Sequence, residues 1–177
     1  MAGNRDTTPP VISCLGEDDW RALRLIRLAA LADAPGSFAG TVAQAEGLGE
    51  RDWRAMTRDG AIFLATVGRQ AVGVAAGVPR DSPLERGLGS MWVAPTWRGR
   101  GVAPLLAGAV IGWARSQGCT RVGLWVPADN ARAQGFYRRQ GFRPTGRTLP
   151  FPGAAHRSIR EMRLALAPGP GEPPPGQ

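Results

Sequence analysis

Runs of hydrophobic residues divide the first half of the chain into short strands and amphipathic helices. We predict a strand over residues 11–15 and then a helix that ends near Asp33, followed by a weaker helix over 42–56 that is interrupted at Gly47 and Gly49. The first helix begins after three consecutive acidic residues, which suit the positive end of its dipole. Its apolar stripe is formed by Leu23, Ile26, Leu28 and Leu31.

The second half of the chain alternates further strands with two helices. Apolar strands over 62–67 and 71–78 are joined by residues 68–70, whose sequence Gly-Arg-Gln predicts a hairpin. The remaining predicted elements are, in order, a strand at 88–93, a helix at 102–117, a strand at 121–126, a helix at 130–140, and strands at 142–145 and 158–166. This order is typical of an α/β or α+β fold in which helices flank a mixed sheet.

Length and composition fit one folded domain with a tail at each end. Of the 177 residues, 43% are hydrophobic, which is enough apolar material for one sizeable core. Residues 1–10 are polar and end on two prolines, and residues 168–177 are almost all proline, glycine and polar residues. Both segments are predicted to be disordered tails, so the folded domain is placed at 11–167.

The charge of the chain points to an anionic partner. The formal net charge is +8, and the sequence contains no lysine, so its fixed positive side chains are all arginines. These arginines are dispersed, with no basic run and no aromatic-studded basic motif, which argues against nucleic acid. A polyanionic cofactor held by a few arginines would use part of the excess charge.

The apolar runs and the two cysteines allow predictions about the cellular compartment and about metal binding. The longest apolar run, 102–114, is too short to cross a bilayer, and the N-terminus lacks the order of a signal peptide. We therefore expect a cytoplasmic protein with no membrane partner. Cys14 and Cys119 are too few and too far apart for a disulfide framework or a metal cluster. Two buried, reduced thiols and no metal are the expectation.

The most specific local feature is a glycine-rich turn between a predicted strand and a predicted helix. It spans 93–103 and reads Val-Ala-Pro-Thr-Trp-Arg-Gly-Arg-Gly-Val-Ala. Gly99 and Gly101 allow backbone conformations that a side chain would forbid, and unpaired amides at a helix start favour an anion. Arg98 and Arg100 can add charge-assisted hydrogen bonds at the rim. The turn is a candidate pyrophosphate site; a surface turn that happens to hold arginine and glycine is the alternative.

Two common phosphate-binding motifs do not fit these glycines. A Walker A loop needs a lysine, which the chain lacks. A dinucleotide-binding fingerprint needs a small residue where Pro104 stands and an acid about twenty residues later, where residues 119–121 are Cys-Thr-Arg. Pro104 itself suits an early helical position but removes one possible phosphate donor.

A second constellation lies on the predicted helix 130–140. Asn130, Gln134 and Tyr137 are spaced i, i+4 and i+7 and so share one face. Tyr137 is the only tyrosine, and its phenol, with a usual pKa of about 10, can donate a proton to a departing thiolate. A half-buried structural tyrosine is the alternative.

Together the two segments resemble the GNAT superfamily of acetyl-CoA-dependent N-acetyltransferases. The family's phosphate loop, Arg/Gln-x-x-Gly-x-Gly/Ala, is matched by residues 98–103. Its later helix, Asn-x-x-Ala-x-x-x-Tyr followed by Gly-Phe, is matched by residues 130–142, and the spacing between the motifs also fits. The resemblance implies a mixed, mostly antiparallel sheet of about six or seven strands, splayed at a central strand and flanked by about four helices.

The resemblance also implies acetyl-CoA as co-substrate and a set of site residues. A bulged strand that pairs with the pantetheine arm would be formed by Met91, Trp92 and Val93. The pyrophosphate would be held by the amides of Arg98, Gly99, Arg100, Gly101, Val102 and Ala103. Asn130 would help to fix the pantetheine or the loop beside it, and Tyr137 would protonate the CoA sulfur.

Direct attack by the amine is favoured over a covalent acyl-enzyme. The chain has no Gly-x-Ser-x-Gly elbow, and its sole histidine, His156, lies in a late loop or strand end. Glu46, Glu50 and Glu85 are candidate general bases, and a bound water could replace all three.

The acceptor side and the identity of the amine stay open. An aromatic wall could be formed by residues 34–38 with Trp53, Trp92 and Trp125, or these rings could be core packing.

The preferred hypothesis for the function is acetylation of a primary amine of a small molecule, such as an amino acid, a polyamine or an amine-bearing antibiotic. A protein α-amine or lysine, reached through an open groove, is the second. A non-catalytic CoA-binding module is the third, against which the intact loop and Tyr137 argue. The resemblance alone suggests a homodimer through the last strands.

Overall fold

One seven-stranded sheet organises the computed structural model, which describes residues 8–38, 40–58 and 61–166. The strand order is β1-β2-β3-β4-β5-β7-β6. The strands are β1 (Val11–Cys14), β2 (Ala61–Val67), β3 (Gln70–Pro79), β4 (Glu85–Val93), β5 (Arg121–Pro127), β6 (Arg143–Phe151) and β7 (Ala154–Ala165). The helices are α1 (Trp20–Asp33), α2 (Val42–Glu46), α3 (Glu50–Arg58), α4 (Val102–Ser116) and α5 (Ala131–Arg139), with short 3₁₀ turns η1 (Glu17–Asp19) and η2 (Pro95–Trp97). The predicted tails lie outside these residues, except for positions 8–10.

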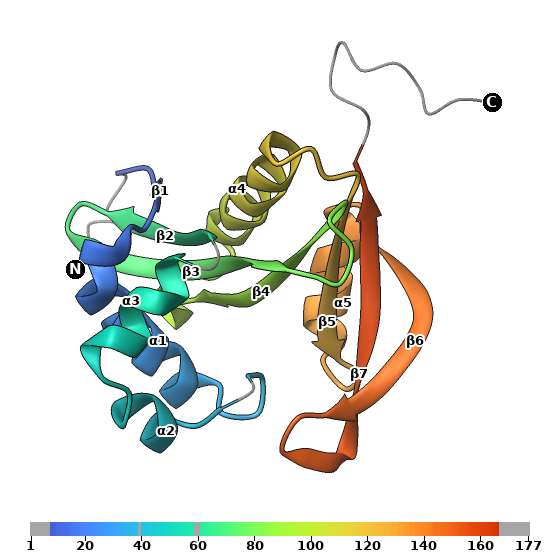
Figure 1. Cartoon of the computed structure of the whole chain (residues 1–177), viewed down its shortest axis with the longest axis horizontal. Coiled ribbons are helices and arrows are strands. Elements are labelled where there is room, and N and C mark those ends of the chain that lie inside the picture. The colour runs from blue at the N-terminus through green and yellow to red at the C-terminus, as the bar shows by residue number, and fades with distance from the viewer. Residues whose placement is uncertain (1–7, 39, 59–60, 167–177) are drawn as a thin grey trace, which may run out of the picture.

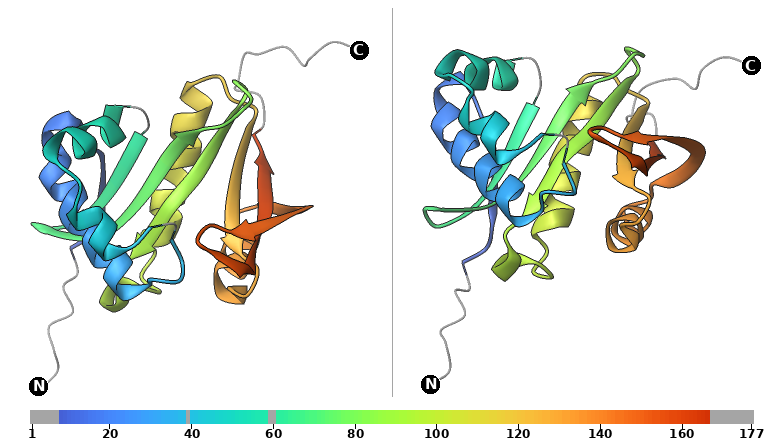
Figure 2. Two further views of the ribbon diagram at one scale, coloured as in Figure 1. Left: turned by 60° about the horizontal axis from the view of Figure 1, so that its bottom comes forward. Right: turned by 90° about the horizontal axis from the view of Figure 1, so that it is seen from below.

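Helices cover the sheet on two faces (Figures 1 and 2). Along β2 the side chains alternate: Ile62 and Leu64 pack with α1 and α3, whereas Phe63 and Ala65 pack with α4. Both faces of the strand are therefore buried, which explains its uninterrupted apolar sequence. The core beneath α4 continues under α5 through the inward residues of β5.

The sheet splits in the middle, as the family resemblance implied. β4 and β5 run parallel but pair only over Glu85–Gly87 and Arg121–Gly123, and beyond these residues the two strands diverge (Figure 2). The edge of β4 from Leu88 onward is consequently left without a strand partner on the β5 side. A β-bulge lies on the same stretch of β4, because Ser90 and Met91 together oppose the single residue Ala75 of β3.

A buried ionic cluster braces the point where the strands part. Glu161 of β7 is fully buried and pairs with Arg80 and Arg163, and Glu85 of β4 pairs with Arg80 at 2.9 Å. Gly123 of β5 leaves the room for this cluster, because a Cβ there would lie 2.5 Å from a Glu85 carboxylate oxygen. The cluster therefore links β4 to β7 across β5.

Three sequence predictions need correction. The weaker helix over 42–56 is two helices, because a capping box at Thr41 fixes the start of α2 and Gly47 ends it. The final hairpin is longer than the predicted strands 142–145 and 158–166, because β6 runs to Phe151 and β7 begins at Ala154; β6 is an edge strand, where proline is tolerated. Cys119 is buried as expected, whereas Cys14 is exposed.

None of the helices in the described residues combines the length and the apolar character that crossing a bilayer requires.

Candidate active site

The glycine-rich turn joins β4 to α4 through two left-handed residues. Gly99 has φ 76° and Gly101 has φ 81°, a region that side-chain-bearing residues rarely adopt. A Cβ at either position would meet no atom within 4 Å, so backbone conformation, and not crowding, calls for glycine. The conformational role predicted for these glycines is confirmed.

The turn presents a row of backbone donors with no protein acceptor. The Arg98 amide donates to the Pro95 carbonyl at 3.3 Å, but within the described chain the amides from Gly99 to Ala103 have no hydrogen-bond acceptor. The last of these belong to the first turn of α4, whose N–H groups lack intrahelical acceptors and whose dipole favours negative charge. Such an array suits a diphosphate.

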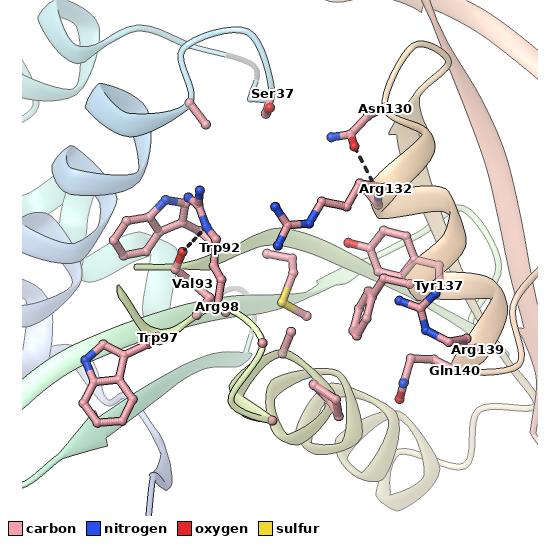
Figure 3. Close-up of a pocket in the computed structure, with 18 of the residues that line it drawn as sticks. Ser37, Trp92, Val93, Trp97, Arg98, Asn130, Arg132, Tyr137, Arg139 and Gln140 are labelled. Carbon is pink, nitrogen blue, oxygen red and sulfur yellow. Dashed lines mark hydrogen bonds between the residues drawn. The ribbon is translucent and has the colours of Figure 1, made fainter. Parts of the chain in front are cut away.

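The Arg98 side chain is bonded to the protein itself instead of extending from the rim. Its Nε donates to the Val93 carbonyl at 3.0 Å (Figure 3), and its guanidinium pairs with the Asp33 carboxylate. Asp33 also accepts a 2.9 Å hydrogen bond from the Trp92 indole nitrogen. This cluster, Asp33–Trp92–Arg98, ties the end of α1 to β4 and to the turn. The Arg100 guanidinium lies 5.0 Å from the centroid of the Trp97 ring.

A cavity of about 590 Å³ lies between the turn and α5, within the usual range for small-molecule sites. All the predicted site residues line it except Arg100 and Val102, whose side chain is buried in the core. In Figure 3, Trp92 and Arg98 lie on one wall and Asn130, Arg132 and Tyr137 on the other. Its charged lining residues in the described chain are Arg98, Arg132 and Arg139. The cavity is therefore positively charged, and we name it the donor cavity.

Tyr137 has a buried ring and a hydroxyl that points into the donor cavity (Figure 3). The ring packs edge-on against Phe136 and Phe142, with centroids 5.1 and 5.8 Å away. Burial raises the pKa of the phenol well above its ordinary value of 10, because the phenolate would lose its hydration. The hydroxyl is therefore a protonated donor at any physiological pH.

Asn130 and Gln134, which share the predicted helix face with Tyr137, have different surroundings. Asn130 Oδ1 caps α5 by accepting from the Ala133 amide at 3.0 Å, and the residue lines the donor cavity. Gln134 is buried and donates to the carbonyls of Pro127 and Ala128, so it fixes the turn before α5 and does not line the cavity.

A smaller cavity of about 100 Å³ continues beyond Met91 and Tyr137, and we name it the acceptor cavity. Its walls come from the α1–α2 loop, β4, β5 and the start of α5. Arg157 of β7 bridges two of these walls: it donates to the Gly36 carbonyl at 2.7 Å and pairs with both carboxylate oxygens of Asp129 at 3.0 Å. The α1–α2 loop is thereby tied to the β6–β7 hairpin.

The aromatic wall predicted for the acceptor side is partly present. Phe38 and Trp125 line the acceptor cavity, and Trp92 lines the donor cavity. Trp53 is fully buried in the core with α1, so its inclusion in the wall was wrong.

None of the predicted general bases borders either cavity. Glu50 pairs with Arg54 on the surface, Glu85 belongs to the buried ionic cluster, and Glu46 is exposed. His156 is exposed on β7. These residues therefore lie outside the linings of the two cavities.

Sequence reasoning missed the Asp33–Trp92–Arg98 cluster and the arginines of α5. Arg132, Phe136, Arg139 and Gln140 line the donor cavity at spacings of four, three and one residues along α5. That helical spacing was the available signal, but it marks a surface stripe equally well.

Comparison with known proteins places this geometry among acetyltransferases. The model of the acetyltransferase (GNAT) family matches residues 27–142. An acetyltransferase of the GNAT family from Streptococcus pneumoniae has 15% identity and a TM-score of 0.75, with 90% of this chain and 100% of that chain covered. Ribosomal-protein-alanine N-acetyltransferase from Brucella melitensis has 26% identity and a TM-score of 0.70, covering 88% and 99%. A protein from Salmonella typhimurium solved with its cofactor acetyl-CoA has 16% identity and a TM-score of 0.72, covering 93% and 98%. A search of curated proteins finds no match.

The Asp33–Trp92–Arg98 cluster makes a testable prediction. Asp33→Asn removes the charge that holds Arg98, so the turn should lose its fixed position and bind acetyl-CoA about tenfold more weakly, equivalent to about 1.4 kcal/mol. Titration calorimetry measures the change. Asp18→Asn is the matched control, because Asp18 also pairs with an arginine, Arg54, but is fully exposed. Equal affinity in the two variants would contradict a role for Asp33 in shaping the turn.

Proposed function

Because the chain belongs to the GNAT family of acetyltransferases, we propose that it transfers an acetyl group from acetyl-CoA to a primary amine of a small molecule, by direct attack in a ternary complex. One observation carries this proposal. Along a single cleft lie a row of unbonded amides, a protonated phenol and a small uncharged cavity, in that order.

The residues present fit acetyl-CoA. The amides from Gly99 to Ala103 offer donors that the protein does not use, and the arginines of the donor cavity offer positive charge for its phosphates. The open edge of β4 beyond Leu88 can pair with the amides of the pantetheine arm, as an added strand would. When bound, acetyl-CoA supplies a thioester carbonyl that an amine can attack.

The chain's own groups then act at the junction of the two cavities. Tyr137 lines both cavities and holds its proton for the sulfur that departs. We propose that backbone N–H groups at the Ser90–Met91 bulge meet the negative charge that develops on the carbonyl oxygen. Most of the rate gain comes from holding amine and thioester in attack geometry. With no acidic side chain on the lining of either described cavity, a bound water takes the proton from the amine.

The acceptor side favours a small molecule. The acceptor cavity is only about 100 Å³, and the Arg157 bridge joins residues adjacent to its opposite walls. A groove that binds a peptide would have to be open where the Arg157 bridge lies. The similarity to ribosomal-protein-alanine N-acetyltransferase makes a protein α-amine the second candidate.

A thiol-release assay tests the proposal and separates the two candidates. With acetyl-CoA present, we expect the protein to release CoA with some small primary amines and to leave peptides with a free α-amine almost unchanged. A matched set of an amino acid, its amide and a peptide that begins with it provides the comparison. Faster turnover of the peptide would establish the second candidate, and no release with any amine would sink the proposed reaction.

Removing the phenol oxygen of Tyr137 tests its role as the general acid. Tyr137→Phe keeps the packing against Phe136 and Phe142 and should lower kcat at least ~100-fold, the lower end of the usual acid–base contribution, while the Kd for acetyl-CoA stays the same. Because burial raises the pKa of Tyr137 above 10, the acid form persists below that pH, and kcat should not fall between about pH 7 and pH 9.5. Unchanged kcat in the variant would remove Tyr137 from the mechanism.

A further inference from the structure

Among the residues that the structure describes, those lining the acceptor cavity carry no charged side chain. Its residues are apolar or neutral, the polar ones being serine, asparagine and tyrosine. A bound molecule with a second ammonium group would bury that charge here without a carboxylate, which is strongly unfavourable. The lining therefore disfavours polyamines and similar polycationic acceptors.

The carboxylates near this cavity are already engaged by the protein. Asp129 is paired through both oxygens with Arg157. Glu161, which pairs with Trp125 across β5 and β7, is fully buried and bound by Arg80, Arg163 and Thr145. Neither carboxylate is available to a cationic acceptor.

The charged groups that touch the lining are arginines. The Arg147 guanidinium lies 5.7 Å from the Trp125 ring centroid, and that ring is part of the cavity wall. On the α1 side, Arg27 donates to the Ser90 hydroxyl at 3.3 Å and lies 5.0 Å over the Phe38 ring. Two cations thus flank the cavity through three of its lining residues.

Arg147 is the better placed of the two to bind a ligand. Its side chain is 60% exposed, and its ion pair with Glu161 is long, at 3.5 Å, while Arg80 and Arg163 hold the same carboxylate more closely. Its planar group can therefore turn toward an anion at the mouth of the cavity without leaving Glu161 unpaired.

We propose that the acceptor is a small amine that also bears a carboxylate, and that Arg147 is the specificity-determining residue that binds this carboxylate. The inference rests on the proposed acetyl transfer and narrows its substrate class. The amine enters the neutral cavity beside Tyr137, and the carboxylate stays at the rim over Trp125.

Matched amines test the proposal. The first set shares a three-carbon skeleton: β-alanine, propylamine and 1,3-diaminopropane. The second compares phenylalanine with 2-phenylethylamine. At saturating acetyl-CoA, CoA release should give a kcat/KM at least tenfold higher for the carboxylate-bearing member in at least one set, with the diamine lowest in the first. Preference for the neutral or dicationic member in both sets overturns the inference and leaves the proposed function standing. No release with any amine overturns both.

Charge variants assign the preference to Arg147. Arg147→Gln should reduce the carboxylate preference to about twofold, and Arg147→Glu should reverse it toward the diamine. The preference is a ratio of kcat/KM values measured within each variant, so a general loss of activity does not imitate this result. Arg69→Gln, in the β2–β3 turn, removes an exposed arginine remote from the site and should keep the full preference. An undiminished preference in Arg147→Glu would overturn the role of Arg147.

Discussion

The parting of β4 and β5 is the constraint on which the rest of the site depends. Two parallel strands that pair for a few residues and then diverge leave backbone edges facing each other across a cleft. At the root of the split, two buried glutamates pair with arginines beside Gly123 and link β4 to β7. The open part of β4 carries the bulge, and α5 forms the opposite wall.

The two ends of this cleft differ in electrostatic character, and this difference suits them to different ligands. The donor end combines unbonded amides, a helix dipole and arginines, which together suit a polyanion. The acceptor end has a neutral lining, and the arginines at this end, Arg27 and Arg147, contact lining residues without lining the cavity themselves. The Tyr137 phenol lies at the boundary, buried enough to stay protonated and still open to the cavity.

Features encoded by local sequence could be predicted, and features made by pairing across long separations could not. The left-handed glycines at 99 and 101 and the helix that they open follow from short-range patterns, whereas the site role of Tyr137 was implied by the family resemblance. Asp33 and Arg98 are 65 residues apart, and nothing in the periodicity of α1 distinguishes this acid from a solvated one. Glu85 was a candidate base by sequence, yet its arginine partners come from β5, from β7 and from the segment before β4. Gln134 shares a helix face with Tyr137 but bonds to its own preceding turn, which spacing alone does not reveal.

An NMR titration of ¹⁵N-labelled protein tests most directly whether the amides from Gly99 to Ala103 bind a diphosphate, because each of these amides reports its own hydrogen bond. We expect large, saturable downfield proton shifts of these signals with CoA and little change with pantetheine, which lacks the diphosphate. If CoA binds while these signals stay in place, the diphosphate is held elsewhere and the turn is not its binding site.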